Sequence, residues 1–323
     1  MDFGHLFNQT LGPMGFNITG RYSCFTGNYN YDTGWDLNLP LVDFDNSNLH
    51  LLHFQDFVTI KDGRVLELEK VERHYGEHAD RVLVTYWTSD LDQVYSGPIN
   101  LIKFSNHNYD MCNDLASGFD QWKHILATDK THHWQCLNGR LCLHRRRAVD
   151  VLEKWQHGWL SYGTDIPLPV HNYQSYFGCN NFPNFLALDY VYGSAPVNIV
   201  TETQYDPPTG IITEKTLLAL AAEQIPIVIG HRGIVDQCRR MGFDMFDDLV
   251  DNSYDQLPNE TRVEAALELN RDLIQGRINL APYRDRLVKQ REYLLHGLPD
   301  RMEREFVVHA SALADRLIPG YTP

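Results

Sequence analysis

The chain has 323 residues, of which 43% are hydrophobic and 22% are charged, and its formal net charge is −14. The length suits two domains or one large one, and the composition is that of a globular protein. The acidic balance disfavours broad, sequence-independent binding to nucleic acid, which needs a basic surface to displace counterions, but it leaves room for a local basic groove.

The sequence carries no signal for membrane insertion or secretion. It has no run of about 18 apolar residues, and its start, MDFGHLF, has an acid where a signal peptide would carry Lys or Arg. We therefore expect a cytoplasmic protein without a membrane span. The six cysteines are scattered without a CxxC pair, so reduced thiols are expected rather than a disulfide framework or a zinc site.

Residues 1–48 are rich in Gly, Asn, Tyr and Asp and show little periodicity. Such a segment predicts irregular loops, which either face a substrate or wrap the surface. Aromatic residues that alternate with Asn and Gly also suit a surface on which a sugar or a base stacks.

From residue 49 onward, apolar strand patterns alternate with helical patterns. Strands are predicted at 49–54, 81–87, 99–104 and 134–138, and helices at 65–75, 89–95 and 110–127. This alternation implies βα units and a parallel sheet, hence an α/β domain.

A helix predicted at 144–157 opens with a basic turn from His144 to Arg147. Positive side chains run against the partial positive charge of a helix N-terminus, and this arrangement would make sense if an anion binds there. The alternative is a solvated basic turn whose charge is balanced by acidic residues elsewhere in the chain. Residues 158–195 contain many Gly, Asn, Pro and Tyr and predict a linker with an irregular lobe.

A second α/β unit is predicted at 196–250. A buried strand at 197–201 ends in Glu202, a loop rich in Pro and Gly follows, a helix opens at Thr213, and a second buried strand covers 225–229. Charge therefore falls at a strand end and a helix start, where parallel sheets bind ligands. Three further helices are predicted at 259–276, 281–297 and 300–317.

The start of the helix at Thr213 could bind a diphosphate. Thr is a suitable N-cap residue, and a helix entered from Gly210 has free backbone N–H groups in its first turn. Glu214 could accept hydrogen bonds from ribose hydroxyls, and Lys215 could neutralise a phosphate. A Glu-Lys pair at a helix start also arises by chance, so these residues alone leave a purely structural role open.

Four strings carry a resemblance to known glycosyltransferases. IITEKTLLALAAEQIPIVIG (211–230) resembles the nucleotide-sugar-binding segment of α-1,3-fucosyltransferase-like and exostosin-like enzymes. RRMGFDMFDDLVDNSYD (239–255) resembles glycosyltransferase-like proteins of large tailed phages. VNIVTET (197–203) and CLNGRLCLHRRRAVDVL (136–152) resemble two other segments of the fucosyltransferase-like group. The resemblance covers roughly residues 134–256.

The resemblance implies roles for individual residues in holding a nucleotide-sugar donor. Glu214 would bind the nucleoside ribose, and Lys215 and Arg145 would bind the diphosphate. Arg140 is the other candidate for the diphosphate-binding arginine, because the loop after Asn138 can be aligned with the family so that either Arg140 or Arg145 takes this position. Glu202 would face the donor sugar or hold the hydrogen-bond network of the site.

The resemblance also implies a GT-B architecture, an α/β fold with two Rossmann-like domains, a central cleft and C-terminal helices. The domains would be an acceptor-side domain at 1–143, a nucleotide-sugar-binding domain at 144–280, and helices at 281–323 that pack back on the N-terminal domain. Retaining GT-B enzymes often show Glu-x7-Glu, whereas Glu214 is followed by Glu223, one residue too far. We therefore expect inversion at the transferred sugar.

An inverting transfer needs a base that deprotonates the acceptor hydroxyl. Asp56 and Asp90 follow predicted strands and are the candidates, with His107 as a third, although each acid also suits a loop or a helix cap. The triplets Asp43-Phe-Asp45 and Asp90-Leu-Asp92 are similar to the Asp-x-Asp metal site of GT-A enzymes, but GT-B sites usually rely on basic residues and a helix N-terminus. We predict no obligatory metal.

The sequence thus predicts a glycosyltransferase whose co-substrate is a UDP- or GDP-linked sugar. The acceptor would be a hydroxymethylated pyrimidine in phage DNA, which would place the protein in the host cytoplasm, or else a glycan or small molecule. His231 and Arg232, after the strand at 225–229, could approach the pyrophosphate or form a surface loop. The alternative from another class is a non-catalytic module that binds a nucleotide sugar.

Overall fold

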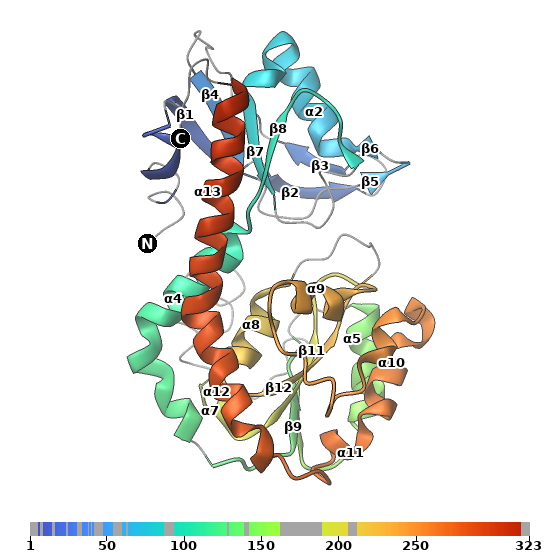
Figure 1. The fold of residues 1–323 in the computed structure, drawn as a ribbon. Helices are drawn as coiled ribbons and strands as arrows, with labels where there is room; N and C mark the ends of the chain where they lie inside the picture. Colours follow the sequence, from blue (N-terminus) through green and yellow to red (C-terminus); the bar gives the residue numbers. More distant parts are fainter. Residues whose placement is uncertain are drawn as a thin grey trace. The chain divides into compact units, whose positions relative to one another are not determined.

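The structure is a computed structural model of the 323-residue chain. The chain forms two compact units, one of Met1–Asp110 with Asp300–Pro323 and one of Met111–Pro299, and Figure 1 labels their helices and strands. The structure describes residues 6, 9–14, 17–23, 25–30, 34–37, 39, 41, 48–53, 60–62, 64–86, 94–127, 129–138, 142–161, 189–205 and 212–317.

The first unit contains a four-stranded parallel sheet. In the order β1-β4-β7-β8, its strands are Asn17–Ser23, Asn48–His53, Val82–Tyr86 and Asn100–Lys103. The last three match the strands predicted at 49–54, 81–87 and 99–104 to within one residue at each end. Two short antiparallel pairs accompany the sheet, β2 (Phe25–Asn30) with β3 (Gly34–Leu37) and β5 (Ile60–Lys61) with β6 (Arg64–Val65).

Helix α2 (Leu66–Tyr75) packs on this sheet and confirms the helix predicted at 65–75. Its buried side chains Leu68, Val71 and Tyr75 recur every three or four residues, so they share one face of the helix. This face joins Val82 and Val84 of β7 in one hydrophobic core. A 3₁₀ helix, η1 (Gly76–Arg81), then leads into β7. Of the helix predicted at 89–95, only residues 94 and 95 are described.

The expectation of an irregular segment at 1–48 is wrong for strands β1, β2 and β3. Among the described residues, strand β1 lies at the edge of the sheet and pairs with β4 alone. Its pairing register shifts between Ile18 and Arg21, and such an irregularity interrupts the alternation by which a strand is recognised in sequence. The sequence of this segment therefore looks irregular, although part of the segment forms paired strands.

The second unit contains another four-stranded parallel sheet, in the order β10-β9-β11-β12. The strands are Gly158–Leu160, Trp134–Cys136, Val197–Thr201 and Ile225–Ile229. The last two coincide with the predicted strands 197–201 and 225–229, and every residue in them is buried. Continuous burial of this kind is typical of parallel strands that helices cover on both faces.

Two expectations about this sheet are wrong. We expected the strand at 134–138 to close the first sheet, whereas β9 pairs with β10 and β11, because an apolar run does not specify its partner strand. We expected 158–195 to be irregular, yet β10 and a short helix, α7 (Asp189–Ser194), lie within it. A strand of three residues is too short to show a period.

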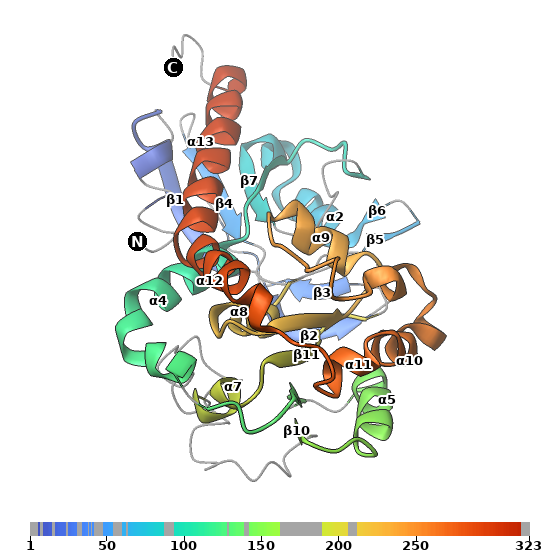
Figure 2. The ribbon, with the colours of Figure 1, turned by 60° about the horizontal axis from the view of Figure 1, so that its bottom comes forward.

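Helices cover both faces of the second sheet. In Figure 1, α8 (Glu214–Ala221) and α12 (Arg284–Glu292) lie on one face, and α5 (Leu143–Leu152) and α10 (Asn259–Leu269) lie on the other. Helix α9 (Ile234–Arg240) follows β12, and Figure 2 shows the same elements from a second direction. Helix α5 ends at Leu152, five residues before the predicted end at 157.

The remaining helices follow the predicted order. The 3₁₀ helix η5 (Asn252–Gln256) precedes α10, and α11 (Arg271–Ile274) follows it. A 3₁₀ turn, η6 (Ala281–Tyr283), and a π-helical turn, η7 (Tyr293–Gly297), flank α12. The helices predicted at 259–276, 281–297 and 300–317 are thus confirmed, with breaks between their parts.

Two long helices cross the boundary between the units. Helix α4 (Asn106–Trp122) begins in the first unit and ends in the second, where η2 (Lys123–Ala127) extends it. Helix α13 (Leu298–Leu317) begins in the second unit and belongs to the first from Asp300 onward. Within the first unit, the ring of Phe306 in α13 lies edge-on to the ring of Phe104, with ring centres 5.1 Å apart. The helix predicted at 110–127 therefore starts four residues early, at Asn106.

Gly158 in β10 lies against the indole of Trp134 in β9, which is buried. A Cβ atom at Gly158 would lie 1.9 Å from Trp134 Cε2 and 2.0 Å from Cζ2. Gly158→Ala should therefore lower the free energy of unfolding, measured by urea denaturation, by about 1–3 kcal/mol, because the indole must move. In a Trp134→Leu background, Gly158→Ala should lower the free energy of unfolding by a smaller amount. Equal costs in both backgrounds would contradict overpacking as the cause.

Both units thus combine parallel sheets with helices, so the chain has an α/β fold. Within the described part of the chain, every helix is too short or too polar to cross a membrane.

Candidate functional site

Parallel pairing brings the carboxyl ends of four strands to one edge of the second sheet, and a polar side chain follows each strand. Asn138 lies two residues after β9, Ser161 follows β10, Glu202 follows β11, and His231 lies two residues after β12. All four side chains are buried. A buried polar group needs hydrogen-bond partners, so this edge must contain a connected polar cluster.

The carboxylate of Glu202 is the centre of this cluster and is fully buried. Oε1 accepts hydrogen bonds from the backbone N–H of Thr213 at 3.2 Å and from Thr216 Oγ1 at 2.6 Å. Oε2 accepts from the backbone N–H of Thr203 at 3.3 Å and from Thr213 Oγ1. Four donors offset the cost of burying a charged carboxylate. Of the two expected roles for Glu202, these contacts favour the one in which it holds the network.

The first turn of α8 is therefore fixed to the end of β11. Thr213 occupies the N-cap position, but its side chain makes no cap hydrogen bond, and its hydroxyl donates to Glu202 instead. Lys215 Nζ lies 3.3 Å from Thr203 Oγ1 and 3.4 Å from Thr213 Oγ1, and it forms an ion pair with Glu214. The structure thus brings together Glu202, Thr213, Glu214 and Lys215 at the start of α8.

A second part of the cluster links β9, β10 and β11. Asn138 Nδ2 donates to the carbonyl of Ser161 at 3.1 Å, and the backbone N–H of Asn138 donates to Ser161 Oγ at 3.0 Å. Thr201 Oγ1 donates to Asn138 Oδ1 at 2.5 Å. The strand-end asparagine therefore ties three neighbouring strands at the same edge that carries Glu202.

His144, in the first turn of α5, reaches the cluster from a third segment. Its Nε2 lies 2.9 Å from the carbonyl oxygen of Glu202, and because a carbonyl only accepts, Nε2 carries the proton. The imidazole stacks on Tyr205, with ring centres 4.6 Å apart and planes 4° apart. Burial lowers the pKa of His144 to about 4, and the charge of Arg145 adds to this effect. His144 is therefore neutral at pH 7.

The three arginines of the basic turn each bind groups within the second unit. Arg145 is buried, and its Nη2 donates to the carbonyl of Thr201 at 3.2 Å. Arg146 pairs with Asp150 at 2.7 Å. Arg147 pairs with Glu264 in α10 and donates to the backbone carbonyl at the start of that helix. Carboxylates of the same unit thus neutralise Arg146 and Arg147. Arg145 instead contacts the carboxyl end of β11.

The fourth strand end is closed by a histidine and an arginine. His231 Nδ1 lies 2.9 Å from the carbonyl oxygen of Arg232, and Nε2 lies 3.2 Å from Gln237 Oε1. Burial lowers the pKa of His231. Arg262 is also buried and donates to the carbonyl of Gly230 at 2.7 Å, and its guanidinium carbon lies 5.2 Å from the ring centre of Tyr205. His231 and Arg262 thus bind backbone carbonyls just after the end of β12.

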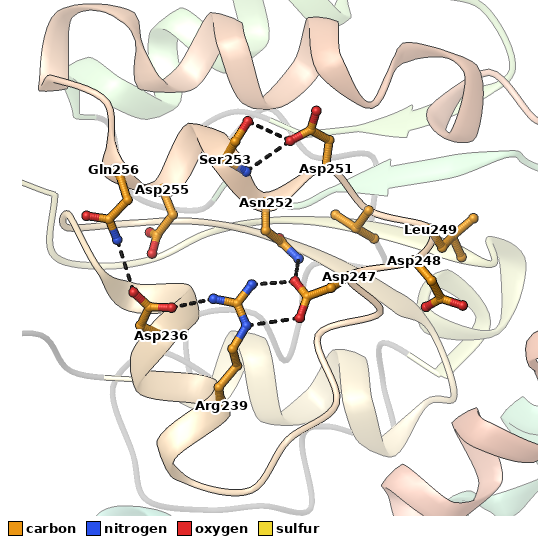
Figure 3. Close-up of a pocket in the computed structure, with 11 residues that line it drawn as sticks. Asp236, Arg239, Asp247, Asp248, Leu249, Asp251, Asn252, Ser253, Asp255 and Gln256 are labelled. Atoms are coloured by element: carbon orange, nitrogen blue, oxygen red, sulfur yellow. Dashed lines mark hydrogen bonds and ion pairs between the residues drawn. The ribbon is translucent and has the colours of Figure 1, made fainter.

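A separate hollow of about 530 Å³ lies beside α9 and η5, and Figure 3 shows the residues that line it. Arg239 forms ion pairs with Asp236 and Asp247 across it. Burial raises the pKa of Asp255, another of its acids. The hollow shares no lining residue with the Glu202 cluster, and its excess of carboxylates would repel a diphosphate.

Several candidates fall outside the described residues, namely Asp43, Asp45, Asp56, Asp90, Asp92 and Arg140. His107 lies in the first turn of α4. The expected base and the expected donor-binding roles thus stay predictions, although the structure describes Arg145, Glu202, Thr213, Glu214 and Lys215.

Several residues of the cluster were not identified from the sequence, among them Thr216, Ser161 and Tyr205. Thr216 lies three positions after Thr213, which puts both on one side of a helix start, so its spacing could have revealed it. Ser161 and Tyr205 carry no such signal, because their partners lie far away in the sequence.

No protein-family model matches the chain, and neither a curated protein nor a solved structure matches it. The fold and the site define an α/β protein with a buried polar cluster around the carboxylate of Glu202 at the carboxyl edge of a parallel sheet.

Proposed function

We propose that the protein is a glycosyltransferase that binds a UDP- or GDP-linked sugar at the carboxyl edge of the second sheet. It would transfer the sugar to an acceptor hydroxyl with inversion and without an obligatory metal, on a GT-B architecture of Rossmann-like domains. The resemblance of residues 134–256 to fucosyltransferase-like, exostosin-like and phage glycosyltransferase-like proteins supports this proposal. The base would be Asp56 or Asp90.

The observation that carries the proposal is the fixation of α8 by Glu202. Parallel sheets bind ligands beyond the carboxyl ends of their strands, and phosphates bind at the N-termini of helices that start there. The four hydrogen bonds to Glu202 hold the start of α8 at this position. A fixed helix start costs no ordering free energy when a ligand binds, which favours affinity.

The polar side chains at this helix start suit the two parts of a nucleoside diphosphate. Lys215 would donate to the diphosphate, and Glu214 would accept from the ribose hydroxyls. Their side chains are 14% and 26% exposed, respectively, so a ligand can reach them. Their ion pair would be exchanged for contacts to the ligand.

The buried groups around them would act through their charge. Arg145 is 2% exposed, so its positive charge would favour a diphosphate without direct contact. Glu202 is held by four donors, so its negative charge is compensated and repels phosphates less. His144 is neutral at pH 7 and adds no charge of either sign.

The proposal predicts that one class of donor stabilises the protein through Lys215. In a thermal-shift series with UDP-, GDP-, CMP- and TDP-sugars, one donor at about 100 times its Kd should raise Tm by roughly 5 °C or more. Lys215→Ala should weaken this donor about 10- to 100-fold, because a charged hydrogen bond contributes about 1.5–3 kcal/mol.

Lys289→Ala is the matched control, since Lys289 is an exposed lysine in α12 of the same unit. It should keep the full shift. No shift with any donor, or an equal shift in Lys215→Ala, would overturn the proposed donor site.

The acceptor can be identified once the donor is known. Incubation with this donor and hydroxymethylcytosine DNA, followed by nucleoside mass spectrometry, separates a DNA acceptor from a glycan or small molecule. Donor binding without transfer to any acceptor would favour a non-catalytic binding module.

A further inference from the structure

A pair of histidines lies at the amino edge of the second sheet, opposite the strand ends of the proposed donor site. His133 immediately precedes β9, and His157 immediately precedes β10. The backbone N–H of His133 donates to the carbonyl of His157 at 2.8 Å, so the two residues are cross-strand neighbours. The imidazoles therefore lie side by side on one surface.

The geometry points to a binding site for one divalent transition-metal ion, such as Zn²⁺, between His133 and His157, and we propose this as a second site of the protein. Neutral imidazole is a preferred ligand of Zn²⁺, Ni²⁺ and Cu²⁺. The ring centres of His133 and His157 are 5.1 Å apart. Two imidazoles on one tetrahedral Zn²⁺ have ring centres roughly 5 Å apart, because each Zn–N bond is about 2.0–2.1 Å long.

The two rings are splayed rather than stacked. Their planes differ by 36°, whereas His144 and Tyr205 in the same unit stack with planes only 4° apart. Within the described residues, neither imidazole forms a hydrogen bond or an ion pair with another side chain. His157 is exposed and His133 is half-buried, so an ion in solution can reach them.

The backbone holds one member of the pair in an uncommon conformation. His157 has φ of 60°, in the left-handed region, which non-glycine residues adopt rarely, although Asn, Asp and His do so more often than others. Such conformations often occur at functional sites, where their cost is offset. On the other side, the ring of His133 lies against Gly276, where a Cβ atom would come within 2.7 Å of Nδ1. Gly276 thus confines the His133 ring.

The neighbouring His132 does not belong to this site. Its Nδ1 lies 2.9 Å from Thr131 Oγ1, and its ring lies edge-on to Trp159 at 5.5 Å. In the described part of the chain, no group of three or more His, Cys, Asp or Glu could hold a metal. Water would therefore fill the remaining positions, and the affinity should lie in the micromolar to submillimolar range.

Titration of the full chain with ZnCl₂ by isothermal calorimetry tests this site. We expect one ion per chain, and both His133→Gln and His157→Asn should weaken binding at least about tenfold, since even residues outside the ligand set affect metal affinity by 10- to 100-fold. Asn also tolerates the left-handed conformation, so His157→Asn should fold. The metal-free Tm of each variant checks this, and His133→Gln decides alone if His157→Asn is unfolded.

His132→Gln and His309→Asn are the controls, because one histidine adjoins the pair and the other is exposed on α13. Both should keep the wild-type affinity. As a second measurement, Cu²⁺ electron paramagnetic resonance should show two coordinating nitrogens in the wild type and one in each single variant. Wild-type affinity in His133→Gln, or an equal loss in the controls, would refute the site.

Discussion

Replacement of Glu202 by alanine is expected to lower the free energy of unfolding by about 3–5 kcal/mol. The substitution removes the acceptor of two backbone N–H groups and two threonine hydroxyls, all at the junction of β11 and α8. A buried donor left without a partner costs about 1–3 kcal/mol, and relaxation of the helix start would recover part of the total. Urea denaturation followed by circular dichroism measures the change.

Glu214→Ala is the matched control for this experiment. Glu214 is the adjacent acid at the same helix start, but it is 26% exposed and pairs with Lys215. Its loss should cost less than about 1 kcal/mol, as for other partly exposed ion pairs. Glu202→Gln should fall between the two, because its amide group would face N–H and O–H donors. Equal effects of Glu202→Ala and Glu214→Ala would contradict the central role of Glu202.

Acid is expected to destabilise the second unit through His144. The unfolded chain takes up a proton near the ordinary histidine pKa of 6.5, whereas in the folded chain burial lowers the pKa of His144 to about 4. At a pH between these two pKa values, unfolding is therefore accompanied by uptake of a proton. The folded state loses stability as the pH falls from about 6.5 to about 4. This histidine should remove about 2–3 kcal/mol between about pH 7.5 and pH 4.5.

His144→Gln tests this prediction, because glutamine does not titrate but can still donate to the carbonyl of Glu202. The variant should be less stable than the wild type near pH 7.5, since it loses the stack on Tyr205. Its stability should nevertheless fall less steeply with acid. His296→Gln, at an exposed histidine of the same unit, should leave the wild-type profile unchanged. A profile for His144→Gln parallel to that of the wild type would exclude this role.

The central strands and the polar residues where β11 meets α8 were predictable because their signals are local. Each residue of β11 and β12 is buried, so both strands are mostly apolar, and charged residues do not occur within them. Glu202 then stands out as the first charge after such a strand, and Thr213 stands out as a cap residue before an apolar helix. Local chemistry of this kind is readable in one sequence.

The rest depends on contacts between distant segments. The pairing of β9 with β11 joins residues more than 60 positions apart, and nothing within the strand specifies that choice. Tyr205 acquires its place only when His144 and Arg262 come together around it. The predicted helix at 144–157 was too long because a pattern of apolar residues continues past Leu152, where α5 ends.

The division of the chain between the two units affects the order of folding during synthesis. The second unit is one continuous segment, Met111–Pro299, whereas the first also needs Asp300–Pro323. Domains usually fold from the N-terminus while the chain emerges from the ribosome. Here the first unit lacks Phe306, the partner of Phe104, until the whole second unit has been synthesised. The second unit can therefore finish folding first, and a ribosome stalled before residue 300 would carry an incomplete first unit.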